Sequence, residues 1–349
     1  MKVATITFGY SQNLGALLQA YALAQFIQRL GHDCKIIKYK DFDNRPFETV
    51  KGLLDGLSDL IFLPDCKNKI KKINLYRQKY LPFTEKTYYI TDDMRELNQQ
   101  FDVFVAGSDQ IWNVHKGVVD EFFLSFVDEQ HKKISYGASF GLSMIPNEYR
   151  EKTAIGINNF DLISVREKTG VELVKQLTGL SCEQVLDPVF LKPKNEWEEF
   201  CGPRKLKEKY IFVYPTQITE NLTKTVKELK KKTGYRVCSL FYFWGVDKVI
   251  KDADPIELVN YIRNAEFVVA SSFHATAFSI ILNKKLFVIP HSTTGSRVVD
   301  LLTDLNMKDC IVLDSQHLNM ENIDYEAVNS LLLEKIIASK NFLREAIDV

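Results

Sequence analysis

The segment Tyr261–Pro290, which reads YIRNAEFVVASSFHATAFSIILNKKLFVIP, constrains the fold more than any other stretch of the chain. Phe267–Ala270 is a short apolar run rich in β-branched residues, which is typical of a buried parallel strand. Two serines follow and favour a helix start, so we expect a helix over Phe273–Leu282. The apolar run Leu286–Ile289, closed by a proline, is expected to be the next buried strand. The segment therefore predicts a βαβ unit within a parallel sheet.

His274 falls in the first turn of the predicted helix, just beyond the carboxyl end of the preceding strand. Ligands gather at this place in open α/β sheets, and the N–H groups and dipole of a helix start favour anions. A helix cap or a core contact is the alternative role for such a histidine. His274 is thus a candidate residue of an anion site.

Composition narrows the class of protein. The chain has 349 residues, enough for two domains, with 46% hydrophobic and 26% charged residues, as in soluble globular proteins. Lys plus Arg equals Asp plus Glu at 45 each, so no basic excess points to nucleic acid. The six cysteines form no C-x-x-C pair, and no apolar run approaches the ~20 residues of a membrane span. With no secretory signal, we expect a cytoplasmic protein with reduced thiols.

The chain opens with a second βαβ pattern, comprising a strand over Val3–Phe8, a helix over Ala16–Leu30 and another strand. The loop between them lacks G-x-G-x-x-G, so we do not predict a dinucleotide site. Asn13 and Gly15 in this loop either contact a ligand or simply form a tight turn before the helix, and both alternatives stay open.

Polar residues also follow strands later in the first half. Ser108 and Asp109 come after the predicted strand Phe101–Ala106, where they either line a pocket or cap the next segment. Arg166 directly follows a short strand, and its planar guanidinium suits a carboxylate or a phosphate. An ion pair with Glu167 or another neighbour is the alternative for Arg166.

The second half begins after a Pro-containing stretch, Lys192–Glu208, which we interpret as a linker. A second α/β block follows, and it contains the Tyr261–Pro290 unit. Arg297 stands at a predicted helix start, where a cation opposes the helix dipole, so we expect an anion as its partner. The last segment, Tyr325–Ile347, has the apolar stripe of a long amphipathic helix.

Two local patterns carry less information. Asp41-Phe42-Asp43 has the D-x-D form with which some glycosyltransferases hold a metal, but a three-residue match is weak. The basic run Lys67–Lys72 is explained by a solvated helix face, and attraction to an anionic membrane surface is the alternative.

Taken together and in order, several motifs resemble the polysaccharide pyruvyl transferase family. These motifs are Asn13–Leu23 (NLGALLQAYAL), Val105–Asn113 (VAGSDQIWN), Ser164–Glu167 (SVRE), Asp187–Val189 (DPV), Phe273–Ala275 (FHA) and Gly295–Arg297 (GSR). Each motif is weak alone, but the ordered set spans nearly the whole chain.

The resemblance implies an α/β fold of two Rossmann-like domains in a GT-B-like arrangement, with a C-terminal helix packing back on the first domain. We expect an N-terminal, acceptor-side domain over 1–192, joined by the helix 325–349, and a donor-side domain over 193–324. The activity implied is transfer of pyruvate from phosphoenolpyruvate onto a sugar of a surface-polysaccharide precursor, as a ketal, with release of phosphate. No cofactor and no metal are expected. A lipid-linked acceptor would bring the protein to the inner membrane face.

The resemblance also implies roles for individual residues. The family's donor-binding arginine, histidine and second basic residue match Arg166, His274 and Arg297. This sequence departs from the family's Arg-Leu-His-Ala motif, because Ser272 and Phe273 stand where the motif has arginine and leucine. We therefore expect Ser272 at the donor site. We expect His274 and Asp109 to be catalytic, with His274 giving a proton to the leaving phosphate and Asp109 activating a hydroxyl. The residues expected to bind the acceptor are Asn13, Gly15, Ser108 and Asp109.

Two other functions remain open at this level. The first is a GT-B glycosyltransferase that uses a nucleotide sugar. The second is a non-catalytic binding protein of the same fold, which the absent motif arginine favours.

Overall fold

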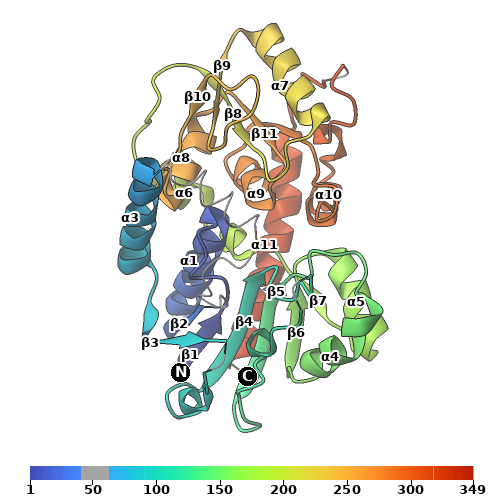
Figure 1. Cartoon of the computed structure of the whole chain (residues 1–349). Coiled ribbons are helices and arrows are strands. Elements are labelled where there is room, and N and C mark those ends of the chain that lie inside the picture. The colour runs from blue at the N-terminus through green and yellow to red at the C-terminus, as the bar shows by residue number, and fades with distance from the viewer. Residues whose placement is uncertain (41–62, 91, 116, 317, 349) are drawn as a thin grey trace.

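The computed structural model describes residues 1–40, 63–90, 92–115, 117–316 and 318–348, and these form two parallel β-sheets with helices around them (Figure 1). The Asp41–Asp43 pattern lies outside the described residues. The first sheet has the order β3-β2-β1-β4-β5-β6-β7, and the second has the order β10-β9-β8-β11-β12. No strand is shared, so the prediction of two Rossmann-like domains is confirmed.

The strands of the first sheet are β1 (Lys2–Ile6), β2 (Asp33–Lys40), β3 (Phe83–Tyr89), β4 (Val103–Asp109), β5 (Lys132–Ala138), β6 (Leu162–Val165) and β7 (Glu183–Gln184). Those of the second are β8 (Tyr210–Tyr214), β9 (Arg236–Ser239), β10 (Lys248–Val249), β11 (Phe267–Ala270) and β12 (Lys285–Val288). The α-helices are α1 (Leu14–Arg29), α3 (Leu63–Tyr80), α4 (Asn147–Ile157), α5 (Lys168–Thr178), α6 (Lys194–Phe200), α7 (Glu220–Thr233), α8 (Pro255–Asn264), α9 (Phe273–Ile281), α10 (Ser296–Asp304) and α11 (Tyr325–Asp348). Short 3₁₀ turns are η1 (Arg95–Gln99), η2 (Asp120–Phe123), η3 (Pro188–Leu191) and η4 (Lys308–Cys310).

The carboxyl ends of both sheets point toward the middle of the molecule (Figure 1). Every strand pairing within the two sheets is parallel, so all strands of one sheet end at the same edge. The loops that follow β1, β4, β6 and β11 therefore face one another across the two domains. Residues that are far apart in the sequence are brought together at this junction.

The prediction of helix 325–347 packing back on the first domain is confirmed. Near its start, the Tyr325 hydroxyl donates to Lys284 O in the second domain. Further along, the Ser339 hydroxyl accepts a hydrogen bond from Leu186 N at 2.9 Å, and the Phe342 ring lies 6.4 Å from that of Tyr136. Helix α11 thus runs from the second domain to the first. No helix in the described ranges is both long and apolar enough to cross a membrane.

The stretch Lys192–Glu208 is not the simple linker that its prolines predict, because it contains helix α6. Trp197 of α6 is fully buried, with its ring 4.9 Å from Phe278 of α9 and 6.1 Å from Tyr21 of α1. Its indole N–H donates to Val189 O at 2.9 Å. The connection between the domains is therefore part of a shared apolar core, which a scan for linker composition does not detect.

Two local expectations also need correction. Strand β4 does not end at Ala106 but continues to Asp109, because Gly107 and Asp109 keep their pairing with β5. Ser272 occupies the N-cap position of α9, as its type predicts, but its side chain makes no capping hydrogen bond.

Candidate active site

His274 lies in the first turn of α9 and contacts the first domain. Its side chain is buried, and its ring packs against the backbone of Gly15, at the start of α1. A Cβ atom added to Gly15 would lie 2.3 Å from His274 Nδ1. On its other side, His274 Nε2 is 3.6 Å from Asp187 Oδ2, and no hydrogen-bond partner for Nε2 is found among the described residues. The imidazole is thus held between the domains, with its Nε2 available for a ligand.

The close approach of Gly15 to His274 gives a testable expectation. Gly15→Ala should push the imidazole out of position, lowering the free energy of unfolding by about 1–3 kcal/mol through overpacking. It should also reduce the proposed transferase activity about 100-fold, since small displacements of reacting groups are costly. Gly170→Ala is the matched control, because Gly170 is also buried and helical but its Cβ would meet nothing closer than 3.2 Å. Thermal unfolding and activity of both variants test this, and normal activity in Gly15→Ala would contradict it.

Asp187 is a buried carboxylate that contacts several residues of the site. It is fully buried, and its Oδ2 accepts hydrogen bonds from Arg166 Nη1 and, at 3.1 Å, from the Ser108 hydroxyl. Its Oδ1 accepts from Val189 N at 3.1 Å. Burial by itself would raise the pKa of the Asp187 carboxyl, but His274 and Arg166 hold that pKa well below its usual range. The sequence analysis assigned no role to Asp187, although it begins the Asp-Pro-Val motif.

Arg166 reaches the junction from the end of β6 and is almost fully enclosed. Besides Asp187, its guanidinium lies near two more carboxylates, at 3.8 Å from Asp109 Oδ1 and 3.9 Å from Glu167 Oε2. Its Nε and Nη2 have no hydrogen-bond partner among the described residues. The ion pair with Glu167 is therefore present, but Asp187 is the nearer partner, and two donor groups remain for a ligand.

Arg297 enters the same place from the start of α10, and it differs from Arg166 in having no carboxylate within 4 Å in the described part of the chain. It is 8% exposed, and its Nε donates to Thr294 O at 3.3 Å. In the orientation of the Gln110 amide that satisfies its hydrogen bonds, the amide oxygen faces Arg297 and accepts from Arg297 Nη2 at 2.9 Å. Burial and the nearby Arg166 lower the pKa of Arg297 to about 10. This cation is incompletely compensated, as expected of a group that binds an anion.

The ring of Phe273 lies near both arginines. The guanidinium carbon of Arg166 lies 4.1 Å from the centroid of the Phe273 ring, and that of Arg297 lies 5.8 Å from it. An aromatic ring attracts cations, by about 0.5–2 kcal/mol depending on desolvation. The residue that departs from the family motif thus helps to keep two like charges close together, a role that sequence reasoning did not predict.

Asp109 and Ser108 end strand β4 at the same junction. Asp109 has φ of 70°, an uncommon conformation for a non-glycine residue, and such outliers cluster at functional sites. Its Oδ1 accepts from Gln110 N at 2.9 Å. Ser108 is fully buried against Asp187, so it does not face solvent in this structure.

The remaining expected residues flank this cluster. The Asn13 side chain caps α1 by accepting from Gly15 N at 3.0 Å and Ala16 N at 3.4 Å, which supports the turn alternative. Ser272 is buried beside Phe273 and His274. The structure therefore brings the predicted donor residues together, and the roles of all of these residues in binding stay predictions.

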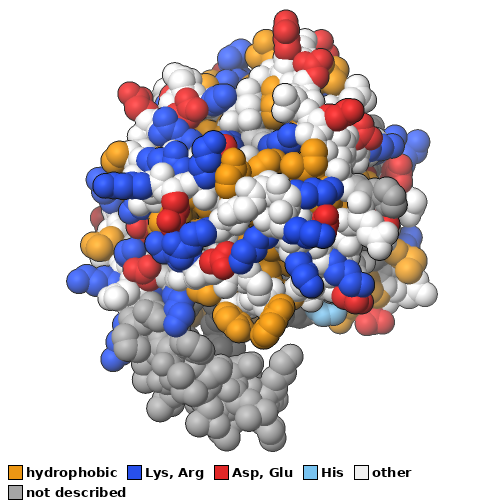
Figure 2. All heavy atoms as spheres, turned by 90° about the horizontal axis from the view of Figure 1, so that it is seen from above, with side chains coloured by type: hydrophobic (Ala, Val, Ile, Leu, Met, Phe, Trp, Pro, Cys, Tyr) orange, Lys and Arg blue, Asp and Glu red, His pale blue; other side chains and the backbone are white. Residues whose placement is uncertain are grey.

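Other features of the second domain lie away from this junction. Figure 2 looks down on that domain and shows Lys and Arg side chains spread over its face, with Asp and Glu between them. Lys230 pairs with Asp247 at 2.6 Å, and Arg236 pairs with Glu208 at 2.9 Å. Such exposed pairs are typical of a solvated surface.

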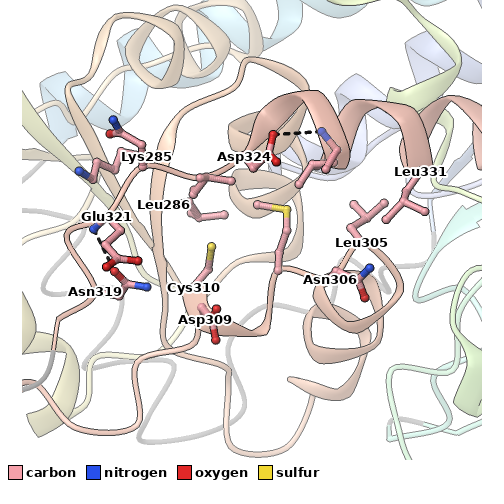
Figure 3. Close-up of a pocket in the computed structure, with 15 residues that line it drawn as sticks. Lys285, Leu286, Leu305, Asn306, Asp309, Cys310, Asn319, Glu321, Asp324 and Leu331 are labelled. Carbon is pink, nitrogen blue, oxygen red and sulfur yellow. Dashed lines mark hydrogen bonds between the residues drawn. The ribbon is translucent and has the colours of Figure 1, made fainter.

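A cavity of about 250 Å³ lies beside the start of α11, at the amino end of β12. Figure 3 shows that Lys285, Cys310, Glu321 and Asp324 contribute to its lining. It opens at the opposite edge of the sheet from His274, so it is not part of the candidate active site. No group of His, Cys, Asp and Glu in the described ranges is arranged to hold a metal ion.

Comparison with known proteins agrees with this geometry. A family model described as polysaccharide pyruvyl transferase matches residues 13–293. No curated protein matches the chain. Among solved structures, UDP-GlcNAc 2-epimerase from Methanocaldococcus jannaschii is similar with a TM-score of 0.53 and 11% identity, covering 95% of this chain and 92% of that one. The spinosyn rhamnosyltransferase SpnG is similar with a TM-score of 0.49 and 12% identity, covering 100% of both chains. At such identities the likeness concerns the fold alone, which is the GT-B arrangement.

Proposed function

The chain belongs to the polysaccharide pyruvyl transferase family, and we propose that it moves pyruvate from phosphoenolpyruvate onto a sugar of a surface-polysaccharide precursor. The product would be a cyclic ketal, and inorganic phosphate would be released. The observation that carries this proposal concerns Arg297, which is buried and has no carboxylate partner among the described residues. It lies beside Arg166 and His274.

Phosphoenolpyruvate carries a phosphate and a carboxylate, which guanidinium groups bind through paired hydrogen bonds. Arg297 supplies an incompletely compensated charge, and Arg166 supplies two donor groups that have no hydrogen-bond partner among the described residues. The N–H groups at the start of α9 add a favourable site for phosphate. The absent motif arginine at Ser272 is thus offset in part by the two cations that Phe273 holds together.

The proposed reaction balances with the groups present. A sugar hydroxyl oxygen forms a bond to C2 of the donor and loses its proton, and one proton is added to C3. A second hydroxyl of the same sugar then bonds to C2 as the C–O bond to phosphate breaks, and the proton that this hydroxyl loses balances the one that the phosphate takes up. We expect His274 to give a proton to the departing phosphate and Asp109 to accept one from a hydroxyl. Asp187 orients the imidazole and the guanidinium of Arg166 together.

Arg166, His274 and Arg297 are only 5–8% exposed, so substrates cannot reach them without movement of the surrounding structure. The cluster lies between two domains, and separation of those domains would open it. We therefore expect the structure to represent a closed arrangement and the substrates to enter an open one.

A direct test measures phosphate release from phosphoenolpyruvate in the presence of candidate lipid-linked saccharides. Release that depends on the saccharide supports the proposal. Thermal shift separates it from nucleotide-sugar transfer, because a ligand that prefers the native state stabilises it. Phosphoenolpyruvate should raise the melting temperature, and a nucleoside diphosphate at the same concentration should raise it less. The reverse order would favour a glycosyltransferase.

His274→Ala is expected to abolish transfer and to lower the free energy of unfolding by about 1–3 kcal/mol, because it leaves a cavity at the domain junction and removes a group that helps to hold the buried Asp187 carboxylate charged. His274→Gln keeps a polar group of similar reach and should not restore activity, since an amide cannot transfer the proton. Phosphate release and thermal unfolding measure both effects. A variant that unfolds several degrees lower but transfers normally would show that the histidine is structural.

A further inference from the structure

Three cations surround the ring of Tyr10, in the loop after β1. Lys40 Nζ lies 4.4 Å from the ring centroid, the Arg77 guanidinium carbon lies 4.5 Å from it, and Lys38 Nζ lies 5.9 Å from it. Lys38 and Lys40 are two residues apart on β2, so their side chains project from the same face of the sheet. Lys40 also lies 5.4 Å from the Tyr89 ring, at the end of β3. We call Lys38, Lys40 and Arg77 the Tyr10 cluster.

Among the described residues, no negative charge compensates the Tyr10 cluster. In the described part of the chain, no carboxylate oxygen lies within 4 Å of any of its three cations, although many other lysines and arginines are paired. Lys72, one turn before Arg77 on α3, pairs with Asp252 at 2.9 Å. Like charges held together repel, and desolvation increases the cost.

Arg77 shows that cost most clearly. It is 8% exposed, and burial lowers its pKa. Its Nη2 donates to Tyr10 O and Ser11 O, both at 2.7 Å, and its Nη1 donates to Asn74 Oδ1 at 2.9 Å. Its Nε has no hydrogen-bond partner in the described ranges. A buried donor without a partner, within a group of like charges, indicates that a ligand supplies the missing acceptor.

We propose that the Tyr10 cluster binds the phosphate or diphosphate group to which the acceptor sugar is attached. The cluster lies at the carboxyl edge of β1 and β2, on the domain expected to hold the acceptor. The loop that Arg77 fastens, at Tyr10 and Ser11, continues to Gly15, which contacts His274. An anion bound here would hold the attached sugar on the side of the loop that leads to His274. This inference rests on the proposed sugar acceptor, but its test does not depend on phosphoenolpyruvate.

The test measures binding of inorganic pyrophosphate by calorimetry to the whole protein, to three single variants and to one double variant. Lys40→Gln should weaken binding about tenfold, as expected for loss of one charge-assisted contact. Lys35→Gln, which removes the same charge from another position on β2, should leave binding unchanged. Arg297→Ala removes the anion-binding group of the donor site; this variant should still bind pyrophosphate, and adding Lys40→Gln to it should weaken that binding about tenfold. Equal affinity in Lys40→Gln and the unaltered protein, or no binding at all, would overturn the proposal.

Stability without ligand gives a second readout. If the cations are present for an anion, Lys40→Gln should keep or raise the melting temperature, since it relieves repulsion. Pyrophosphate should then raise the melting temperature of the unaltered protein more than that of the variant. A lower melting temperature of the free variant, with the same pyrophosphate response, would show that Lys40 only packs on Tyr10 and would overturn the proposal.

Two larger probes distinguish a lipid-linked phosphate from a nucleotide-linked one. Farnesyl diphosphate binding more tightly than pyrophosphate indicates a lipid-linked acceptor, and uridine diphosphate binding more tightly indicates a nucleotide-linked one. In both cases Lys40→Gln should weaken the probe about tenfold. If Lys40→Gln changes the affinity for neither probe, the diphosphate binds elsewhere and the proposal is overturned.

Discussion

Arg297→Met is expected to abolish pyruvyl transfer and at the same time to raise the free energy of unfolding by about 1–3 kcal/mol. The physical reason is that Arg297 is buried with no carboxylate within 4 Å in the described ranges, and its pKa is lowered to about 10. Methionine is unbranched and apolar and fills most of the space of the arginine stem, so it removes the burial cost of the charge. It also removes the cation that we propose binds the donor.

The pH dependence of this gain has a definite sign. The pKa of Arg297 is lower in the folded protein than in the unfolded chain, so the folded state disfavours the charged form. That cost is fully present below pH 10 and decreases as the pH rises above 10. The stability difference between Arg297→Met and the unaltered protein should therefore shrink in alkaline solution.

Denaturant unfolding and steady-state kinetics of Arg297→Met check both effects. Arg236→Met is the matched control, because Arg236 is exposed and paired with Glu208, and it should change neither quantity much. Arg297→Lys should recover part of the donor binding, because it keeps the charge but not the planar guanidinium. A destabilised Arg297→Met that retains its Michaelis constant for phosphoenolpyruvate would mean that this arginine is structural.

Asp187→Asn is expected to lower the free energy of unfolding by about 3–5 kcal/mol, the usual cost of removing one partner of a buried ion pair. Asparagine keeps the shape of the side chain but leaves Arg166 without its nearest negative charge. Transfer should be lost as well, since the imidazole of His274 also faces this carboxylate, at 3.6 Å. Urea unfolding measures the loss of stability.

A double-mutant cycle isolates the ion pair. Arg166→Met together with Asp187→Asn should be less destabilising than the sum of the two single changes, because the second change removes the uncompensated charge. The pKa of Asp187 is depressed in the folded state, so its contribution to stability is present above the ordinary aspartate pKa. That contribution is lost only as the pH falls below about 4. Additive effects in the cycle would contradict the pairing.

These two expectations show how the domain junction differs from the rest of the molecule. Arg297 is an uncompensated cation, Arg166 has two donor groups without partners among the described residues, and Asp109 has a positive φ. Features of this kind cost stability, and they persist where function requires them. The apolar core around Trp197, with its rings in close contact, supplies stability to the same junction.

The sequence determined the elements of the central βαβ unit and their order. Phe267–Ala270 was predicted with the bounds that β11 has, and the helix after it differs from α9 by one residue at its end. Such runs are specified by local patterns of apolar residues and by the residues that begin helices. Because the strands of each sheet are parallel, the residues that follow them meet at one edge. That Arg166 of the first sheet would lie near His274 and Arg297 of the second was implied by the family resemblance.

Only the tertiary structure decided which of those residues compensate one another. Asp187 pairs with Arg166, the ring of Phe273 contacts two guanidiniums, and Gly15 makes room for His274. Each of these contacts joins segments that are distant along the chain. Local propensity carries no information about them, because burial and charge compensation depend on which side chains meet after the domains pack. The single buried cation without a carboxylate partner in the described ranges of this junction, Arg297, could be identified only after those partners were in place.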